Sequence, residues 1–166
     1  MTDVSRLVVF AVGNESRGDD GVGPTLLRRI EPVLPVGGRA VLDFQLQVEH
    51  ALELRDADLA LFVDACCGLD APFAFREIGP EAQASSFSHA LSPSAVLAVF
   101  RRIERIAPPP AFVLGIRANG FGLGEGLSPG TSVDLEHAVR FALTLLAAPD
   151  PAVWRTRADG DFFLPV

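Results

Sequence analysis

The apolar run LALFVDA at residues 59–65 restricts the possible folds of this chain more than any other feature. Both of its faces are apolar, which is typical of a strand buried between two layers of helices in a parallel sheet. Other apolar runs alternate with helical patterns along the chain. The sequence therefore predicts an α/β fold, a three-layer sandwich in which a twisted, mostly parallel sheet carries helices on both faces.

The pattern also places the individual elements. Ser92 is a favourable N-cap and Pro93 suits the first helical position, so one helix is predicted to begin there. Residues 73–78 (FAFREI) alternate between apolar and polar, as an edge strand does, and this strand is expected to be antiparallel. The remaining strands are expected at residues 6–12, 39–43 and 111–116, and the remaining helices at residues 20–33, near 48–52 (Val48, Ala51 and Leu52 inward) and 132–147 (Glu136 paired with Arg140).

A chain of 166 residues is long enough for one domain with a sizeable core. We expect a single α/β domain over residues 1–148 and a C-terminal tail over residues 149–166. Trp154, Phe162 and Phe163 make this tail apolar, so it is expected to cover a helix pair or a partner surface. The first residues lack the layout of a signal peptide and no apolar run approaches the length of a membrane span, so the predicted location is the cytoplasm.

Charge and residue usage exclude several classes of function. The net charge is −7, from 14 basic and 21 acidic residues, which argues against nucleic acid and anionic membranes as partners. All the basic residues are Arg, so a P-loop lysine and a Schiff-base lysine are both excluded. The adjacent Cys66 and Cys67 are predicted to be a buried, reduced pair.

Two adjacent acids follow the first strand, in VVFAVGNESRGDDGVGP at residues 8–24. The glycines do not have the spacing of a dinucleotide fingerprint, and the carboxylates of Asp19 and Asp20 would repel a pyrophosphate, so no nucleotide cofactor is expected. Helix capping accounts for one Asp at this place. It does not account for a third acid, Asp64, at the end of the buried strand. Because parallel strands end at one edge of a sheet, the three acids predict a site that attracts a cation or shares a proton.

An imidazole completes this prediction. His50 and His137 are expected on the surface, whereas His89 lies in a Ser-rich loop that can reach the edge carrying Asp20 and Asp64. Two carboxylates and one imidazole are ligands suited to nickel, zinc or manganese. Three protein ligands leave coordination positions open for another molecule.

The segment GNESRGDDGVGP at residues 13–24 resembles the signature that opens the hydrogenase maturation endopeptidases. The likeness continues in order through residues 42–54 (LDFQLQVEHALEL), 59–65, 88–93 (SHALSP) and 115–130 (GIRANGFGLGEGLSPG), and so covers nearly the whole chain up to Ala147. This chain has Glu15, Ser16 and Arg17 where the family usually has an aliphatic pair, a variant that resembles the branch serving soluble, bidirectional hydrogenases.

The resemblance implies an endopeptidase that removes the C-terminal extension from the large-subunit precursor of a [NiFe] hydrogenase. It implies that Asp20, Asp64 and His89 recognise nickel already installed in that precursor. Two chemistries stay open: the metal polarises the scissile carbonyl or a water, or a carboxylate such as Asp19 acts as base in an aspartic-type mechanism.

Two rival functions belong to other classes. A receiver-like phosphoacceptor module has the same paired acids and strand-end Asp, but it needs a lysine after its last strand, where this chain has Arg117. A non-catalytic nickel-binding chaperone would bind the precursor without shortening it. A nucleophilic Ser is disfavoured because no GxSxG motif is present, and a nucleophilic Cys66 or Cys67 because Asp64 opposes a thiolate.

Overall fold

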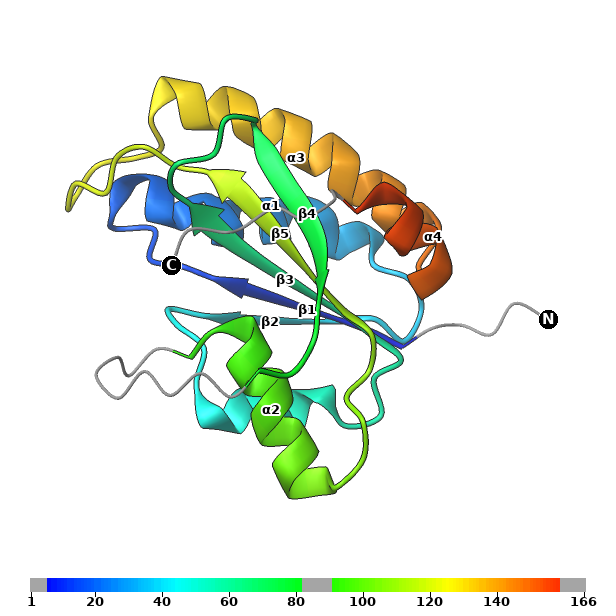
Figure 1. Cartoon of the computed structure of the whole chain (residues 1–166). Helices are drawn as coiled ribbons and strands as arrows, with labels where there is room; N and C mark the ends of the chain where they lie inside the picture. Colours follow the sequence, from blue (N-terminus) through cyan, green and yellow to red (C-terminus); the bar gives the residue numbers. More distant parts are fainter. Residues whose placement is uncertain (1–5, 82–90, 159–166) are drawn as a thin grey trace.

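A five-stranded sheet in the order β2-β1-β3-β5-β4 forms the centre of the molecule (Figure 1). The computed structural model describes residues 6–81 and 91–158. The strands are β1 (Leu7–Val12), β2 (Arg39–Asp43), β3 (Leu59–Cys66), β4 (Phe73–Ile78) and β5 (Ala111–Arg117). Four of them run parallel, and the edge strand β4 is antiparallel to β5. The predicted α/β class and the antiparallel edge strand are therefore confirmed.

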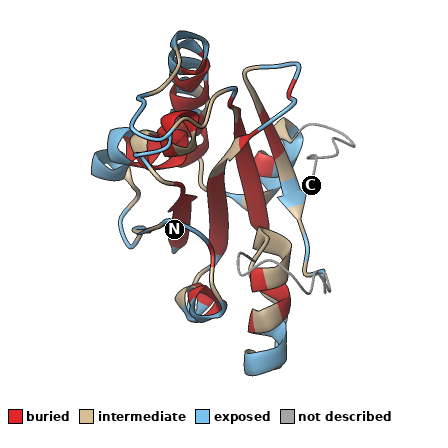
Figure 2. Ribbon diagram, turned by 90° about the vertical axis from the view of Figure 1, so that its left-hand side faces the viewer, coloured by how far each residue is buried: buried red, intermediate tan, exposed pale blue. Residues whose placement is uncertain are grey.

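Helices cover both faces of this sheet. On one face lie α1 (Val22–Ile30), α3 (Pro129–Ala147) and α4 (Pro151–Arg157); on the other lie α2 (Pro93–Glu104) and the 3₁₀ helix η3 (Val48–Leu54) (Figure 1). Two shorter 3₁₀ helices, η1 (Gly18–Gly21) and η2 (Glu31–Val33), flank α1. Figure 2 shows the resulting burial, with the central strands buried between the two layers.

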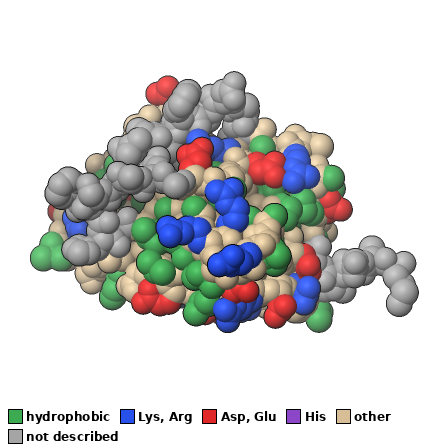
Figure 3. Space-filling view, turned by 60° about the horizontal axis from the view of Figure 1, so that its bottom comes forward, with side chains coloured by type: hydrophobic (Ala, Val, Ile, Leu, Met, Phe, Trp, Pro, Cys, Tyr) green, Lys and Arg blue, Asp and Glu red, His purple; other side chains and the backbone are tan. Residues whose placement is uncertain are grey.

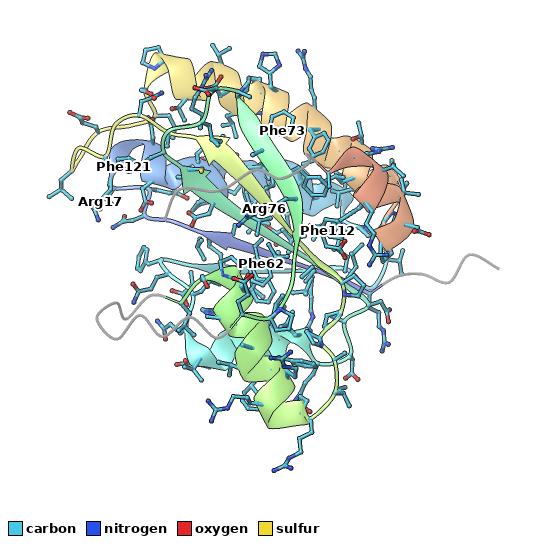
Figure 4. All side chains as sticks on the ribbon, in the orientation of Figure 1. Arg17, Phe62, Phe73, Arg76, Phe112 and Phe121 are labelled. Atoms are coloured by element: carbon cyan, nitrogen blue, oxygen red, sulfur yellow. The ribbon has the colours of Figure 1, made fainter. Side chains whose placement is uncertain are left out.

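The central strands supply apolar side chains to two separate layers of core. Phe62 of β3 lies on the α2 side, whereas Phe112 of β5 and Phe73 of β4 belong to the layer beneath α3 (Figure 4). This two-sided burial is the reason why the sequence of β3 is apolar at successive positions rather than at alternate ones.

The segment at residues 48–54 differs from its prediction in the face that it buries. It is a 3₁₀ helix, with three residues per turn, so Ala51 and Leu54 share the inward face. Val48 and Leu52, which the α-helical period placed inward, are 54% and 44% exposed. His50 is also buried, because it occupies position N3 of a capping box in which its Nδ1 accepts from the Gln47 N–H, so its predicted exposure is wrong.

Two further predictions need correction. Glu136 accepts its hydrogen bonds from Arg29 of α1, with Oε1 2.7 Å from Nη1, whereas Arg140 acts on Glu136 through its charge. Cys66 is buried and free, as expected of it, but Cys67 is exposed, so the two do not form a buried pair.

The chain after residue 148 begins with α4, whose Trp154 is fully buried. The indole Nε1–H donates to the carbonyls of Leu145 and Ala148, at 3.1 and 2.9 Å. Its ring packs edge-on against Phe75 and Phe112. Trp154 thus joins the main core, while Phe162 and Phe163 lie outside the described residues.

The outer face formed by α2 and η3 has arginines interspersed with apolar side chains (Figure 3). The last turn of α2 contributes the exposed Arg101 and Arg102, and Ile103 beside them is 48% exposed. Along the described ranges, no helix combines the length and the apolar character that crossing a membrane requires.

Candidate active site

The parallel strands β1, β2, β3 and β5 all point to one edge of the sheet, where the loops that follow them converge (Figure 1). Arg17 and Phe121, from the loops after β1 and β5, both lie at this edge (Figure 4). Sites of open α/β sheets form at such an edge because the loops, not the strands, can adapt to a ligand.

Asp20 reaches this edge through a tightly folded loop. Its Oδ2 accepts a hydrogen bond from the Asn14 N–H at 2.8 Å, which folds the loop back over the end of β1. Gly13 makes the fold possible, because its φ of +147° suits glycine and a Cβ there would lie 2.0 Å from the Asp20 carbonyl oxygen. The side chain of Asp20 therefore has a fixed place and remains partly exposed.

Asp64 lies near the end of β3 and is also partly exposed. Burial raises the pKa of its carboxyl group to about 7, although the Ala65 N–H donates to Oδ1 at 2.8 Å and favours the charged form. The negative charge of Asp20 raises this pKa further. The structure thus brings Asp20 and Asp64 close enough for their charges to interact.

Asp19 has a different environment and faces into the protein. It is fully buried and accepts five hydrogen bonds from the loop after β5 and the start of α3. The donors are the N–H groups of Asn119, Gly120 and Ser128 and the hydroxyls of Ser128 and Thr131. Burial opposes its charge, but these hydrogen bonds outweigh burial and lower the pKa of Asp19 to about 2. A carboxylate that is shielded from solvent and so weakly basic does not suit the base role predicted for it.

The predicted third ligand, His89, lies outside the described residues. Across residues 6–81 and 91–158, no group of three His, Cys, Asp or Glu side chains is placed to hold a metal ion. The set of Asp20, Asp64 and His89 therefore stays a prediction.

An imidazole and a further carboxylate that the sequence reasoning missed lie at the same edge. Asp43 ends β2, and its carbonyl oxygen accepts from the Gly13 N–H at 3.1 Å. His50 Nε2 lies 3.3 Å from Asp43 Oδ2. The rule that placed Asp20 and Asp64 at this edge applies equally to the last residue of β2, so Asp43 could have been predicted. The place of His50 could not, because it depends on the capping box that its Nδ1 forms with the Gln47 N–H.

A cavity of 490 Å³ opens beside Asp43. Asp43 and Glu15 give it carboxylates, and Leu42, Phe44 and Pro24 give it apolar walls. The rest of its lining comes from residues 13, 14 and 16 of the loop that holds Asp20. Such a cleft can hold a segment of peptide chain beside the acidic edge.

Arg117, which stands where a receiver module has its lysine, is paired with Asp134. Arg117 ends β5, and its guanidinium donates to both carboxylate oxygens of Asp134 on α3, at 2.8 and 3.0 Å. The Asp134 side chain is almost fully buried, so the bidentate pair fixes Arg117 against α3. This contact does not favour a phosphoryl-binding role for Arg117.

Comparisons with protein-family models and with curated proteins gave no match for the chain. Comparison with solved structures gave several. The hydrogenase maturating endopeptidase HybD from E. coli superposes with a TM-score of 0.69 at 21% identity, over 87% of this chain and 93% of that one. The chain has the fold of the hydrogenase maturation endopeptidases.

Two archaeal structures support the same conclusion about the fold. The [NiFe] hydrogenase maturation protease HycI from Thermococcus kodakarensis has a TM-score of 0.66 at 20% identity, over 88% of this chain and 95% of that one. A hydrogenase 2 maturation peptidase from a Thaumarchaeota archaeon has a TM-score of 0.61 at 22% identity, over 86% and 98%. The maturation endopeptidase fold thus extends over nearly the whole length of each of these chains.

Proposed function

We propose that this protein is an endopeptidase that removes the C-terminal extension from a [NiFe]-hydrogenase large-subunit precursor after nickel insertion. The observation that carries the proposal is the pair of carboxylates, Asp20 and Asp64, at the loop edge of a maturation endopeptidase fold. The cavity lined by the loop that holds Asp20 offers room for the peptide to be cut.

The electrostatics of Asp64 support recognition of a cation. With a pKa of about 7, this carboxyl group is partly protonated at neutral pH when no cation is near. A nearby positive charge favours the ionised form, so nickel carried by the precursor would release that proton. We infer that Asp20, Asp64 and His89 contact this nickel, and that the free enzyme needs no tightly held metal of its own.

The proposed chemistry is recognition of nickel combined with activation of a water molecule. An aspartic-type mechanism requires two carboxyl groups that share a proton, and nickel on Asp20 and Asp64 would oppose that sharing. Asp19 is sequestered by its five hydrogen bonds. We therefore infer that a further carboxylate at the cavity acts as base, which separates the residues that recognise nickel from the residue that activates water.

The test uses purified hydrogenase large-subunit precursor with its C-terminal extension, in nickel-loaded and nickel-free forms. We expect mass spectrometry to show shortening of the loaded form alone, and loss of shortening with Asp20→Asn, Asp64→Asn or His89→Ala. Asp58→Asn is the matched control, because Asp58 lies just before the opposite end of β3, where it pairs with Arg6. Binding of the loaded precursor without shortening would instead identify a nickel-binding chaperone.

A further inference from the structure

The proposed reaction needs a base that is neither sequestered nor engaged with nickel. Two acids line the cavity, Glu15 and Asp43. Glu15 pairs with Arg28 of α1, and both side chains are about half exposed, at 46% and 55%. Asp43 lies at the end of β2, where its carbonyl oxygen accepts a hydrogen bond from the Gly13 N–H. Its position is therefore better defined than that of Glu15.

The ring of His50 has a fixed orientation. The Gln47 N–H donates to His50 Nδ1 at 2.8 Å, so Nδ1 acts as the acceptor and the ring proton lies on Nε2. The ring also packs edge-on against Phe10 of β1, and only 11% of the side chain is exposed. The protonated nitrogen is consequently the one that lies 3.3 Å from Asp43.

Asp43 retains the capacity to bind another group. Its Oδ1 accepts from the Phe44 N–H at 2.7 Å, and its Oδ2 contacts His50. An ionised carboxylate has about four acceptor positions, so these contacts from the described residues fill two of the four. Because 36% of the side chain is exposed at the cavity, a water molecule or a substrate can reach this carboxylate.

We propose that His50 is a positioning residue that fixes Asp43 at the cavity, and that Asp43 is the base that activates the attacking water. This inference rests on the proposed function. The water oxygen bonds to the scissile carbonyl carbon while Asp43 takes one of its protons. The C–N bond then breaks, and the leaving amine takes that proton from Asp43, so the carboxylate is regenerated and the atoms balance.

The experiment measures kcat for cleavage of the nickel-loaded precursor and, separately, the Kd of that precursor and the melting temperature of each variant. We expect Asp43→Asn to lower kcat by about 10²- to 10⁴-fold, which is the usual contribution of a general base. His50→Ala should lower kcat by about 10- to 100-fold, as loss of an orienting residue does. Kd should stay within about twofold in both variants, since neither residue is among the three proposed to contact nickel.

Two further measurements separate positioning from a general structural role. Added imidazole should restore kcat in His50→Ala but not in Asp43→Asn, and His50→Gln, which keeps an N–H donor, should retain more activity than His50→Ala. His137→Ala is the matched control because His137 is exposed on α3. If the alanine variant does not fold, His50→Gln and Asp43→Asn still decide the question.

The outcomes distinguish this inference from the proposed function. Full kcat in His50→Ala or in Asp43→Asn overturns the inference and leaves the peptidase assignment intact. A loss of kcat that follows melting temperature, with no rescue by imidazole or by Gln, also overturns it. Failure of the wild-type protein to shorten any precursor overturns both.

Discussion

The hydroxyl of Thr131 donates to the carboxylate of Asp19 at 2.8 Å, although 112 residues separate the two in the chain. Thr131 lies in the first turn of α3, and Asp19 lies in η1. This contact and the four other hydrogen bonds to Asp19 join the loop after β1 to the loop after β5. Asp19 thus fixes the loop in which its neighbour Asp20 presents a carboxylate to the candidate site.

Replacing Asp19 by Asn should destabilise the protein strongly. The amide NH₂ group would face donors that now point at a carboxylate, and each buried donor left without an acceptor costs about 1–3 kcal/mol. Urea unfolding should show a lower midpoint with an unchanged slope. Asp20→Asn is the comparison, because Asp20 is partly exposed and, among the described residues, its carboxylate accepts one backbone hydrogen bond, from Asn14. This variant should affect cleavage far more than stability. Equal unfolding midpoints for the two variants would contradict the structural role of Asp19.

The titrations of Asp19 and Asp64 should change the free energy of unfolding in opposite directions as the pH rises. The pKa of Asp19 is lowered from 3.8 to about 2, so its contribution is present above pH 3.8 and is lost as the pH falls toward 2. The pKa of Asp64 is raised from 3.8 to about 7, so the folded state binds more protons than the unfolded state between these values. Stability should therefore fall as the pH rises from about 4 to 7.

The measurement for Asp64 is the free energy of unfolding at several pH values, for wild type and for Asp64→Asn. The variant should lack the decrease between about pH 4 and 7, because an amide does not titrate. A decrease of the same size in both proteins would show that another group is responsible. The metal-free protein is the right sample, since a bound cation would keep Asp64 ionised and remove the effect.

Trp154 should contribute more to stability than any exposed residue of α4. Replacing a fully buried Trp by Ala costs about 3–5 kcal/mol through lost burial and the cavity that remains. Arg155→Ala removes only a partly exposed ion pair with Glu77, which is worth about 0–1 kcal/mol. Denaturant titration of both variants would check the contrast. Similar small effects would mean that α4 does not complete the core.

The sequence predicts those features that depend on local signals. Ser92 caps α2 through a hydrogen bond from the Ala95 N–H at 3.1 Å, and the helix starts at Pro93 as the two residues predict. The apolar pattern likewise places β3 between two layers of core. Each of these signals lies within a few residues of its effect.

The features that the sequence did not reveal depend on distant partners or on the exact local geometry. Nothing near Asp19 in the chain shows that its acceptors are filled from residues 119–131. His50 was predicted to lie on the surface, but its capping box with Gln47 orients the ring so that Nε2 faces Asp43. The sequence could locate the acids at the sheet edge. Only the fold could show which of these acids faces the cavity.

Gly13 should be indispensable to the candidate site. A methyl group at this position would lie 2.0 Å from the Asp20 carbonyl oxygen and 3.2 Å from the Pro24 ring, and the φ of +147° is unfavourable for alanine. Gly13→Ala must therefore move the loop that holds Asp20, which should abolish cleavage of the nickel-loaded precursor and lower the melting temperature. Gly79→Ala is the control, since a Cβ there meets no atom within 4 Å. Retention of cleavage by Gly13→Ala would show that the position of Asp20 relative to Asp64 is not what the activity requires.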